Sequence, residues 1–150
     1  MPQSLTCLVY HIIFSTKERR RLILPQLLPR LDEYIGGIIR TDKGILIATG
    51  GVEDHTHVLA HINKNMTIPE GVKNIKSLST KWIHEIFPDL RIFSWQGGYA
   101  AFTVSKHDIP DVKAYIEHQQ EHHRTLTFKE ELIALLEAHG VEYDERYLWD

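Results

Sequence analysis

Residues 55–62, with the sequence HTHVLAHI, alternate between two kinds of side chain. Successive side chains of an extended chain point to opposite faces, so His55, His57 and His61 share one face with Leu59. The other face consists of Thr56, Val58, Ala60 and Ile62. The alternation predicts a β-strand with one imidazole-rich face and one apolar face.

His55 and His57 are spaced to bind one metal ion. Residues two apart on a strand lie about 6.6 Å apart, and an imidazole nitrogen binds an ion at about 2.0–2.1 Å. Both rings can therefore lean onto a single ion. The alternative is a pair of half-buried histidines that hydrogen-bond to their neighbours, because a lone H-x-H pattern is short and common.

The periodicity of the whole chain predicts a succession of strands and helices. Strands are expected at residues 5–15, 45–50, 55–62, 91–95 and 99–105, and helices at about 27–39, 70–87, 110–123 and 127–140. The QGG between the last two strands indicates a hairpin, and Thr127 with Glu130 indicates a capping box. We expect an α+β, ferredoxin-like (RRM-like) fold, an antiparallel sheet with helices packed on one face.

Length and composition limit the class of protein. A chain of 150 residues suits one domain, here residues 1–150, with an acidic C-terminal helical segment at about 125–150. No apolar run approaches 18 residues and the N-terminus lacks a signal-peptide layout, so we expect a cytoplasmic protein. The single Cys7 excludes a metal site built on cysteines, and any metal must be bound by histidines, carboxylates or amides.

The net charge of −3 conceals an uneven distribution. Residues 1–107 carry 13 Lys and Arg against 9 Asp and Glu, whereas residues 108–150 carry 4 against 11. Two basic groups in the first part could face phosphates, although such groups are often only solvated surface. They are the run Lys17, Arg19, Arg20 and Arg21, and the helical trio Lys73, Lys76 and Lys81.

Tyr115 and Gln119 lie four residues apart on the helix predicted at 110–123. This spacing places both side chains on one face, one turn apart. If that helix packs over the imidazole-rich face of the strand, Gln119 supplies a third metal ligand and Tyr115 lies beside the ion. The alternative is a Tyr and a Gln on the flank of a helix with no chemical role.

The chain as a whole resembles a known family, the single-tyrosine HUH transposases of the TnpA type in the insertion sequence 200/605 group. The resemblance covers nearly the full length. It rests on YHIIFSTKERR, DHTHVLAHI, FSWQGGYAAFTVS and YIEHQQEHH, which occur in the expected order. One departure is Thr56, which stands where the family has a bulky hydrophobic residue; on a strand it points away from the ion.

The resemblance implies both a mechanism and an assembly. Members of the family bind single-stranded DNA hairpins at transposon ends, and cut and rejoin strands through a phosphotyrosine. Carried onto this chain, it implies that His55, His57 and Gln119 are the metal ligands and that Tyr115 is the nucleophile. Each chain has one Tyr115, whereas moving a DNA segment requires two cuts, so we expect a homodimer. The resemblance implies further that the tyrosine helix of one subunit can complete the histidine site of the other, and we expect such shared sites. Residues 105–110 are compatible with either arrangement.

The chemistry agrees with these residue types. A divalent ion neutralises charge that builds up on phosphoryl oxygens, and a nearby cation helps a phenol of reference pKa about 10 to react as phenolate. The phosphotyrosine conserves the bond energy, so no ATP is required, and the chain contains no G-x-x-x-x-G-K-[ST] loop. Imidazoles with an amide oxygen suit Mg²⁺ or Mn²⁺, and ligand type alone also admits Zn²⁺ or Co²⁺.

Further histidines and two rival functions remain open. His61 is expected in the surroundings of the ion or on the surface, His118 could replace Gln119 as a ligand, and His122 could contact DNA phosphate. One rival is a metal-dependent hydrolase, for which only Glu53 and Asp54 offer a carboxylate beside the histidines. The other is a non-catalytic single-stranded DNA-binding protein whose stacking surface consists of Trp95, Tyr99 and Phe102, although these aromatic residues also fit a core.

Overall fold

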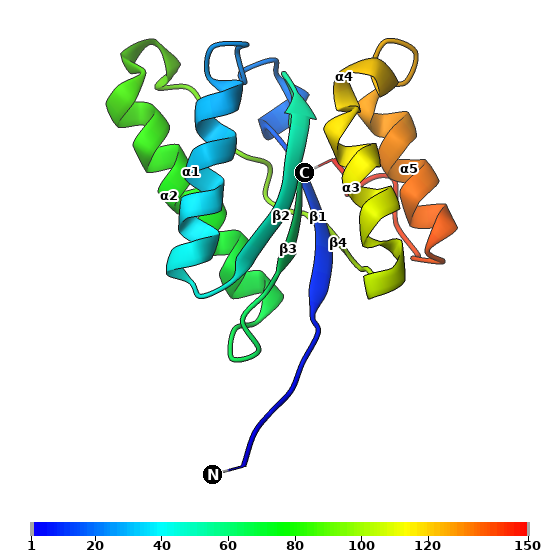
Figure 1. Cartoon of the computed structure of the whole chain (residues 1–150). Coiled ribbons are helices and arrows are strands. Elements are labelled where there is room, and N and C mark those ends of the chain that lie inside the picture. Colours follow the sequence, from blue (N-terminus) through cyan, green and yellow to red (C-terminus); the bar gives the residue numbers. More distant parts are fainter. Residues whose placement is uncertain (1, 150) are drawn as a thin grey trace.

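Four strands form one antiparallel sheet in a computed structural model that describes residues 2–149 (Figure 1). The strands are β1 (Val9–Ser15), β2 (Ile45–Val52), β3 (His55–His61) and β4 (Ala100–Thr103), in the order β2-β3-β1-β4. The helices are α1 (Leu28–Thr41), α2 (Ile68–Ile86), α3 (Ile109–Glu117), α4 (Gln119–His122) and α5 (Phe128–Ala138). This arrangement confirms the predicted α+β fold with an antiparallel sheet of ferredoxin-like order.

Helices cover both faces of the sheet, so the prediction of helices on one face was wrong (Figure 1). On one side, α1 and α2 bury a core against alternate residues of β1 and β3, such as Phe14 and Val58. On the other side, α3 and α5 pack over the face that carries His55 and His57. The reason is that the acidic C-terminal segment contains an apolar stripe. Its residues Phe128, Leu132 and Leu136 are buried with Ile13 and Phe102.

The approach of α3 to the sheet depends on one glycine. At Gly50 in β2, an added Cβ would lie 2.1 Å from the carbonyl oxygen of Ile116 in α3. That separation is well inside van der Waals contact, so only glycine permits this packing distance. Ile116 itself is fully buried against Leu59 and Ala48, which fixes α3 over β2 and β3.

Three local predictions need correction. The segment 91–95 is not a strand: only Trp95 forms an isolated bridge, with Thr16, because Phe93 and Trp95 turn into the core beneath α2. The helix predicted at 110–123 is interrupted at His118, where α3 ends and α4 begins. The acidic segment is helical only over α5, and the described residues 139–149 contain no helix. The capping box of Thr127 and Glu130 is present as predicted.

Among residues 2–149, no helix combines the length and the apolar character needed to cross a membrane.

Candidate active site

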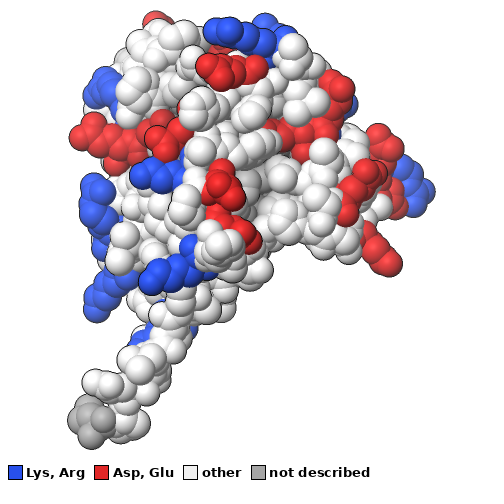
Figure 2. Space-filling model, turned by 45° about the vertical axis from the view of Figure 1, so that its right-hand side comes forward, with Lys and Arg blue, Asp and Glu red and all other residues white. Residues whose placement is uncertain are grey.

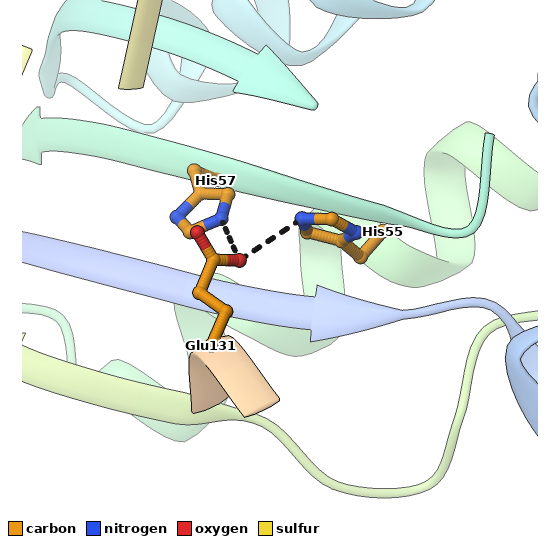
Figure 3. Close-up of side chains that lie close together, drawn as sticks. All are labelled: His55, His57 and Glu131. Carbon is orange, nitrogen blue, oxygen red and sulfur yellow. Dashed lines mark hydrogen bonds and ion pairs between the residues drawn. The ribbon is translucent and has the colours of Figure 1, made fainter. Parts of the chain in front are cut away.

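His55 and His57 on β3 meet Glu131 of α5 beneath the helical layer (Figure 3). One nitrogen or oxygen atom from each of the three side chains lies within 4.8 Å of the others. Oε1 of Glu131 is 3.2 Å from Nε2 of His55 and 3.1 Å from Nε2 of His57. All three residues are buried, so the group is enclosed and not a chance cluster of surface side chains.

Gln119 joins this group from α4. Its Oε1 lies 3.0 Å from Nε2 of His55, and its Nε2 donates to Oε2 of Glu131 over 3.0 Å. The side chain is buried. The residues predicted as ligands, His55, His57 and Gln119, are therefore brought together, although the helix that carries Gln119 is separate from the one that carries Tyr115.

Tyr115 projects from α3 onto the same carboxylate. Its hydroxyl donates a hydrogen bond to Oε2 of Glu131, and its ring centroid lies 5.9 Å from that of His57. The ring is half-buried, and His122 packs against it with a centroid separation of 4.7 Å. The phenol thus lies beside the candidate ligands in one and the same chain.

Sequence analysis missed three residues of the site. The first is Glu131, which is 74 residues from His57 along the chain. The other two are His11 and His123, for which no sequence pattern indicates a role. Nε2 of His123 lies 3.0 Å from Oε1 of Gln119 and 3.1 Å from Oε1 of Glu131. A signal for Glu131 did exist, because it stands on the same helical stripe as Phe128 and Leu132, where a charged residue is unusual.

Two hydrogen bonds, one part-buried and one buried, hold the histidine rings on the side away from Glu131. Nδ1 of His55 lies 2.7 Å from Oδ1 of Asp54, and Nδ1 of His57 lies 2.7 Å from Nε2 of His11. Both rings therefore direct Nε2 toward Glu131. Glu53, the other acid expected near the histidines, is exposed and lies 3.9 Å from Arg21.

Burial and hydrogen bonding act in opposite directions on the protonation of the two histidines. Burial alone lowers the pKa of His55, but its bonds to Asp54 and Glu131 outweigh burial and raise it to about 9. Burial lowers the pKa of His57 to about 4 despite the carboxylate of Glu131. Without a metal, His55 is thus the cationic ring and His57 the neutral one at neutral pH.

Glu131 and Tyr115 are also shifted. Burial favours the protonated form of Glu131, but hydrogen bonds from the surrounding histidines hold its pKa well below the usual range. Burial, followed by the bond to Glu131, raises the pKa of Tyr115. The site contains an ionised carboxylate aimed at a phenol that does not ionise unaided.

The remaining predicted residues lie outside this group. His61 is at the far end of β3 and half-exposed, and the exposed His118 directs Nδ1 to the carbonyl oxygen of Ala114 at 2.6 Å. Lys17, Arg20 and Arg21 are exposed, and the guanidinium of Arg19 lies over the ring of Trp149 at 5.3 Å. Thr56 is buried on the opposite face of β3, as predicted from the alternation.

The donor atoms suit a divalent cation. Two imidazole nitrogens, an amide oxygen and a carboxylate oxygen are ligands common to Mn²⁺, Zn²⁺ and similar ions. Adjacent ligands of an octahedral ion with bonds of about 2.1 Å lie about 3 Å apart. Three separations among these atoms, from His55 to Gln119 and from each histidine to Glu131, are 3.0–3.2 Å and match that requirement, and the buried carboxylate supplies the negative charge.

Comparison with known sequences gives relatives over most of the chain. The family described as Transposase IS200 like matches residues 4–119. The ISDra2 transposase TnpA of Deinococcus radiodurans is 26% identical over 119 residues, which cover 76% of this chain and 85% of that protein. The transposase for insertion sequence element IS200 of Salmonella typhimurium is 26% identical over 117 residues, or 75% of this chain and 76% of that protein.

Solved structures share the fold. A crystal structure of a Deinococcus radiodurans R1 protein superposes with a TM-score of 0.65 at 26% identity, covering 79% of this chain and 96% of that chain. A REP-associated tyrosine transposase bound to a REP hairpin has a TM-score of 0.55 at 15% identity, with 77% and 70% covered. The family match includes β3 with both histidines, Tyr115 and Gln119, whereas Glu131 lies beyond it. The chain belongs to the Transposase IS200 like family.

Proposed function

We propose that the protein cuts and rejoins single-stranded DNA at hairpin ends through a 5′-phosphotyrosine on Tyr115. The observation that carries the proposal is the position of one carboxylate. Glu131 accepts the hydroxyl hydrogen of Tyr115 on Oε2 and contacts Nε2 of both His55 and His57 with Oε1. A nucleophile and a set of metal ligands are thereby joined through a single side chain.

The first step transfers a strand to Tyr115. The phenol oxygen attacks the scissile phosphorus and its proton passes to Oε2 of Glu131. The bond from phosphorus to the 3′-oxygen breaks, and the departing 3′-oxygen takes a proton from water. The products are a phosphotyrosine on the 5′ side and a free 3′-hydroxyl on the other. In the second step a 3′-hydroxyl attacks the same phosphorus and loses its proton to water, while the bond to Tyr115 breaks and Glu131 returns the stored proton to the phenol oxygen.

His55, His57 and Gln119 would hold the divalent cation, Mg²⁺ or Mn²⁺, with Glu131 as a further ligand through Oε1. When bound, the cation neutralises charge on the phosphoryl oxygens and favours the phenolate. The role assigned to Glu131 is argued from this chain's geometry alone, because the residue lies outside the part that matches the family.

The two rival functions fit less well. A metal-dependent hydrolase would need a water beside the carboxylate, yet the hydroxyl that donates to Glu131 is that of Tyr115. A non-catalytic binder that stacks bases on Trp95, Tyr99 and Phe102 would need these rings exposed, but Trp95 and Phe102 are only 8% and 5% exposed. Tyr99 alone has an open face, at 39%.

The surface suggests where DNA would lie. Figure 2 turns the helical layer over the site forward and shows acidic side chains spread over that face, with basic ones mostly near its margins. A groove of about 750 Å³ runs along α2, and its lining includes Lys73, Lys76 and Lys81 with Ser77 and Thr80, against one acidic residue, Glu85. Amines and hydroxyls are donors suited to a phosphate backbone, and we propose this groove, with the exposed Lys17, Arg20 and Arg21, as the contact for the hairpin.

The proposal extends to the assembly of the protein. We propose a homodimer, because moving a DNA segment requires two cuts and closed two-fold symmetry is the commonest arrangement of homo-oligomers. Tyr115 and the histidines of one chain already lie together, so each subunit contains the whole constellation. Exchange of the tyrosine helix between subunits is therefore not needed to build a site.

The test is a search for the covalent adduct. The protein would be incubated with labelled single-stranded DNA from the flanks of its own gene and Mn²⁺, and the products separated under denaturing conditions. We expect a labelled protein band that Tyr115→Phe abolishes while folding and DNA binding persist. Cleavage without an adduct would indicate a hydrolase, and binding without cleavage a non-catalytic DNA-binding protein.

A further inference from the structure

His11 is a buried histidine that the proposed reaction leaves without a role. It lies on β1, is 4% exposed, and places Nε2 at 2.7 Å from Nδ1 of His57. The two rings are 5.0 Å apart between centroids and inclined by 27°. Neither nitrogen of this pair faces solvent, so the hydrogen bond is the means by which both are satisfied.

Either Nε2 of His11 or Nδ1 of His57 carries the hydrogen that the two rings share. Its location determines whether Nε2 of His57 has a lone pair with which to bind a cation. A neutral imidazole has one N–H and one lone pair. If Nδ1 of His57 carries the hydrogen and donates it to His11, Nε2 of His57 keeps a lone pair directed at the site. If His11 donates instead, Nε2 of His57 carries the hydrogen and donates it to Glu131 at 3.1 Å.

We propose that His11 is a positioning residue that sets the tautomer of His57, accepting its Nδ1–H when Nε2 binds the cation and donating to Nδ1 when the cation is absent. The inference rests on the proposed metal site. An imidazole suits this role because it can donate or accept at the same nitrogen, whereas a carboxylate only accepts. The ring of His11 is buried, and burial favours the neutral form of an imidazole in both states.

The different partner at Nδ1 of His55 supports this role for His11. His55 has a carboxylate, Asp54, at its Nδ1, and that partner fixes Nδ1–H permanently. A second carboxylate behind His57 would add a further buried negative charge beside Glu131, which is costly. A neutral partner that can reverse its hydrogen bond avoids that cost, so the two ligands are oriented by chemically different groups.

Substitutions at His11 separate hydrogen bonding from packing. His11→Leu keeps much of the volume but neither donates nor accepts, whereas His11→Gln can do both. We expect Leu to weaken Mn²⁺ binding by about 10–100-fold, the effect usual for partners behind metal-bound histidines, and Gln to stay within a few-fold of the parent chain. His61→Leu, the same change at a half-exposed position of β3, should leave Mn²⁺ affinity unchanged.

The readouts are Mn²⁺ titration followed by the EPR signal of the free ion, thermal unfolding of each variant, and NMR of ¹⁵N-labelled histidines with and without Mg²⁺. The NMR spectrum should show His57 protonated at Nδ1 when Mg²⁺ is bound and at Nε2 when it is absent. Equal Mn²⁺ affinity in His11→Leu and the parent chain, or a His57 tautomer that does not change, would overturn the inference while the metal site stands. Failure of the parent chain to bind any divalent ion would overturn the proposed function itself. The NMR measurement on the parent chain tests the tautomer change of His57 even if His11→Leu does not fold.

Discussion

Replacement of Glu131 by Gln removes one charge and one acceptor from the centre of the site while keeping its shape. The carboxylate accepts from Tyr115 and Gln119 and contacts the rings of His55, His57 and His123. Glutamine offers one oxygen, and its amide N–H₂ would face groups that also donate. Loss of a general base costs about 10²–10⁴ in rate, and loss of one partner of a buried ion pair costs about 3–5 kcal/mol of stability.

We therefore expect Glu131→Gln to form the DNA adduct about 10²–10⁴-fold more slowly than the parent chain, to bind Mn²⁺ more weakly, and to unfold at a lower temperature. The rate is measured in single turnover with a labelled hairpin oligonucleotide, at a temperature where both proteins are folded. Glu130→Gln is the matched control: the same change one residue earlier, on an exposed side chain whose capping box with Thr127 tolerates Gln. Adduct formation by Glu131→Gln within about threefold of the control would refute the role assigned to this carboxylate.

Four further outcomes are expected. His57→Ala should abolish cleavage and weaken Mn²⁺ binding, whereas His61→Ala should be mild; equal damage in metal titrations would mean that the ligands are wrongly chosen. Mixing a Tyr115→Phe chain with a His57→Ala chain should restore no cleavage, because each chain holds its own constellation, and recovery in a verified heterodimer would show shared sites. In the metal-free protein, the pKa of His55 is raised from 6.5 to about 9. Its contribution of about 3 kcal/mol to the free energy of unfolding is therefore present below pH 6.5 and lost as pH rises through 9. Urea unfolding should show lower stability at pH 9.5 than at pH 7, and constant or rising stability would contradict this assignment. Lys73→Ala should lower hairpin affinity and reduce the slope of log affinity against log salt by about one, and an unchanged slope would remove this groove from the DNA contact.

Local periodicity was sufficient to find the parts of the site that lie close together in sequence. The period of two in β3 placed His55 and His57 on one face, and the spacing of four placed Gln119 near Tyr115. These inferences depend only on how a strand or a helix directs its side chains, which the sequence specifies directly. The break at His118 was not foreseen, because no Pro or Gly marks it.

Contacts between distant segments were beyond such reasoning. Which residue of α5 meets β3 depends on how far and at what angle the helix docks, and the apolar stripe of Phe128 and Leu132 specifies only which face is buried. His11 and His57 likewise meet across two strands whose register is set by the whole sheet. The segment 91–95 misled because its aromatic residues favour a strand, whereas Trp95 instead donates from Nε1 to Oγ of Ser79 at 3.0 Å.

Gly50 determines how closely the helix that carries Tyr115 approaches the sheet. Its bare backbone permits α3 to sit on β2 at the carbonyl of Ile116, the residue that directly follows Tyr115. A single methyl group there would push the helix outward and carry the phenol away from Glu131 without altering any group that takes part in the chemistry. We therefore expect substitutions of Gly50 to reduce activity as strongly as substitutions of His55 or His57. The distance between Tyr115 and Glu131 could be adjusted by changing residues of β2.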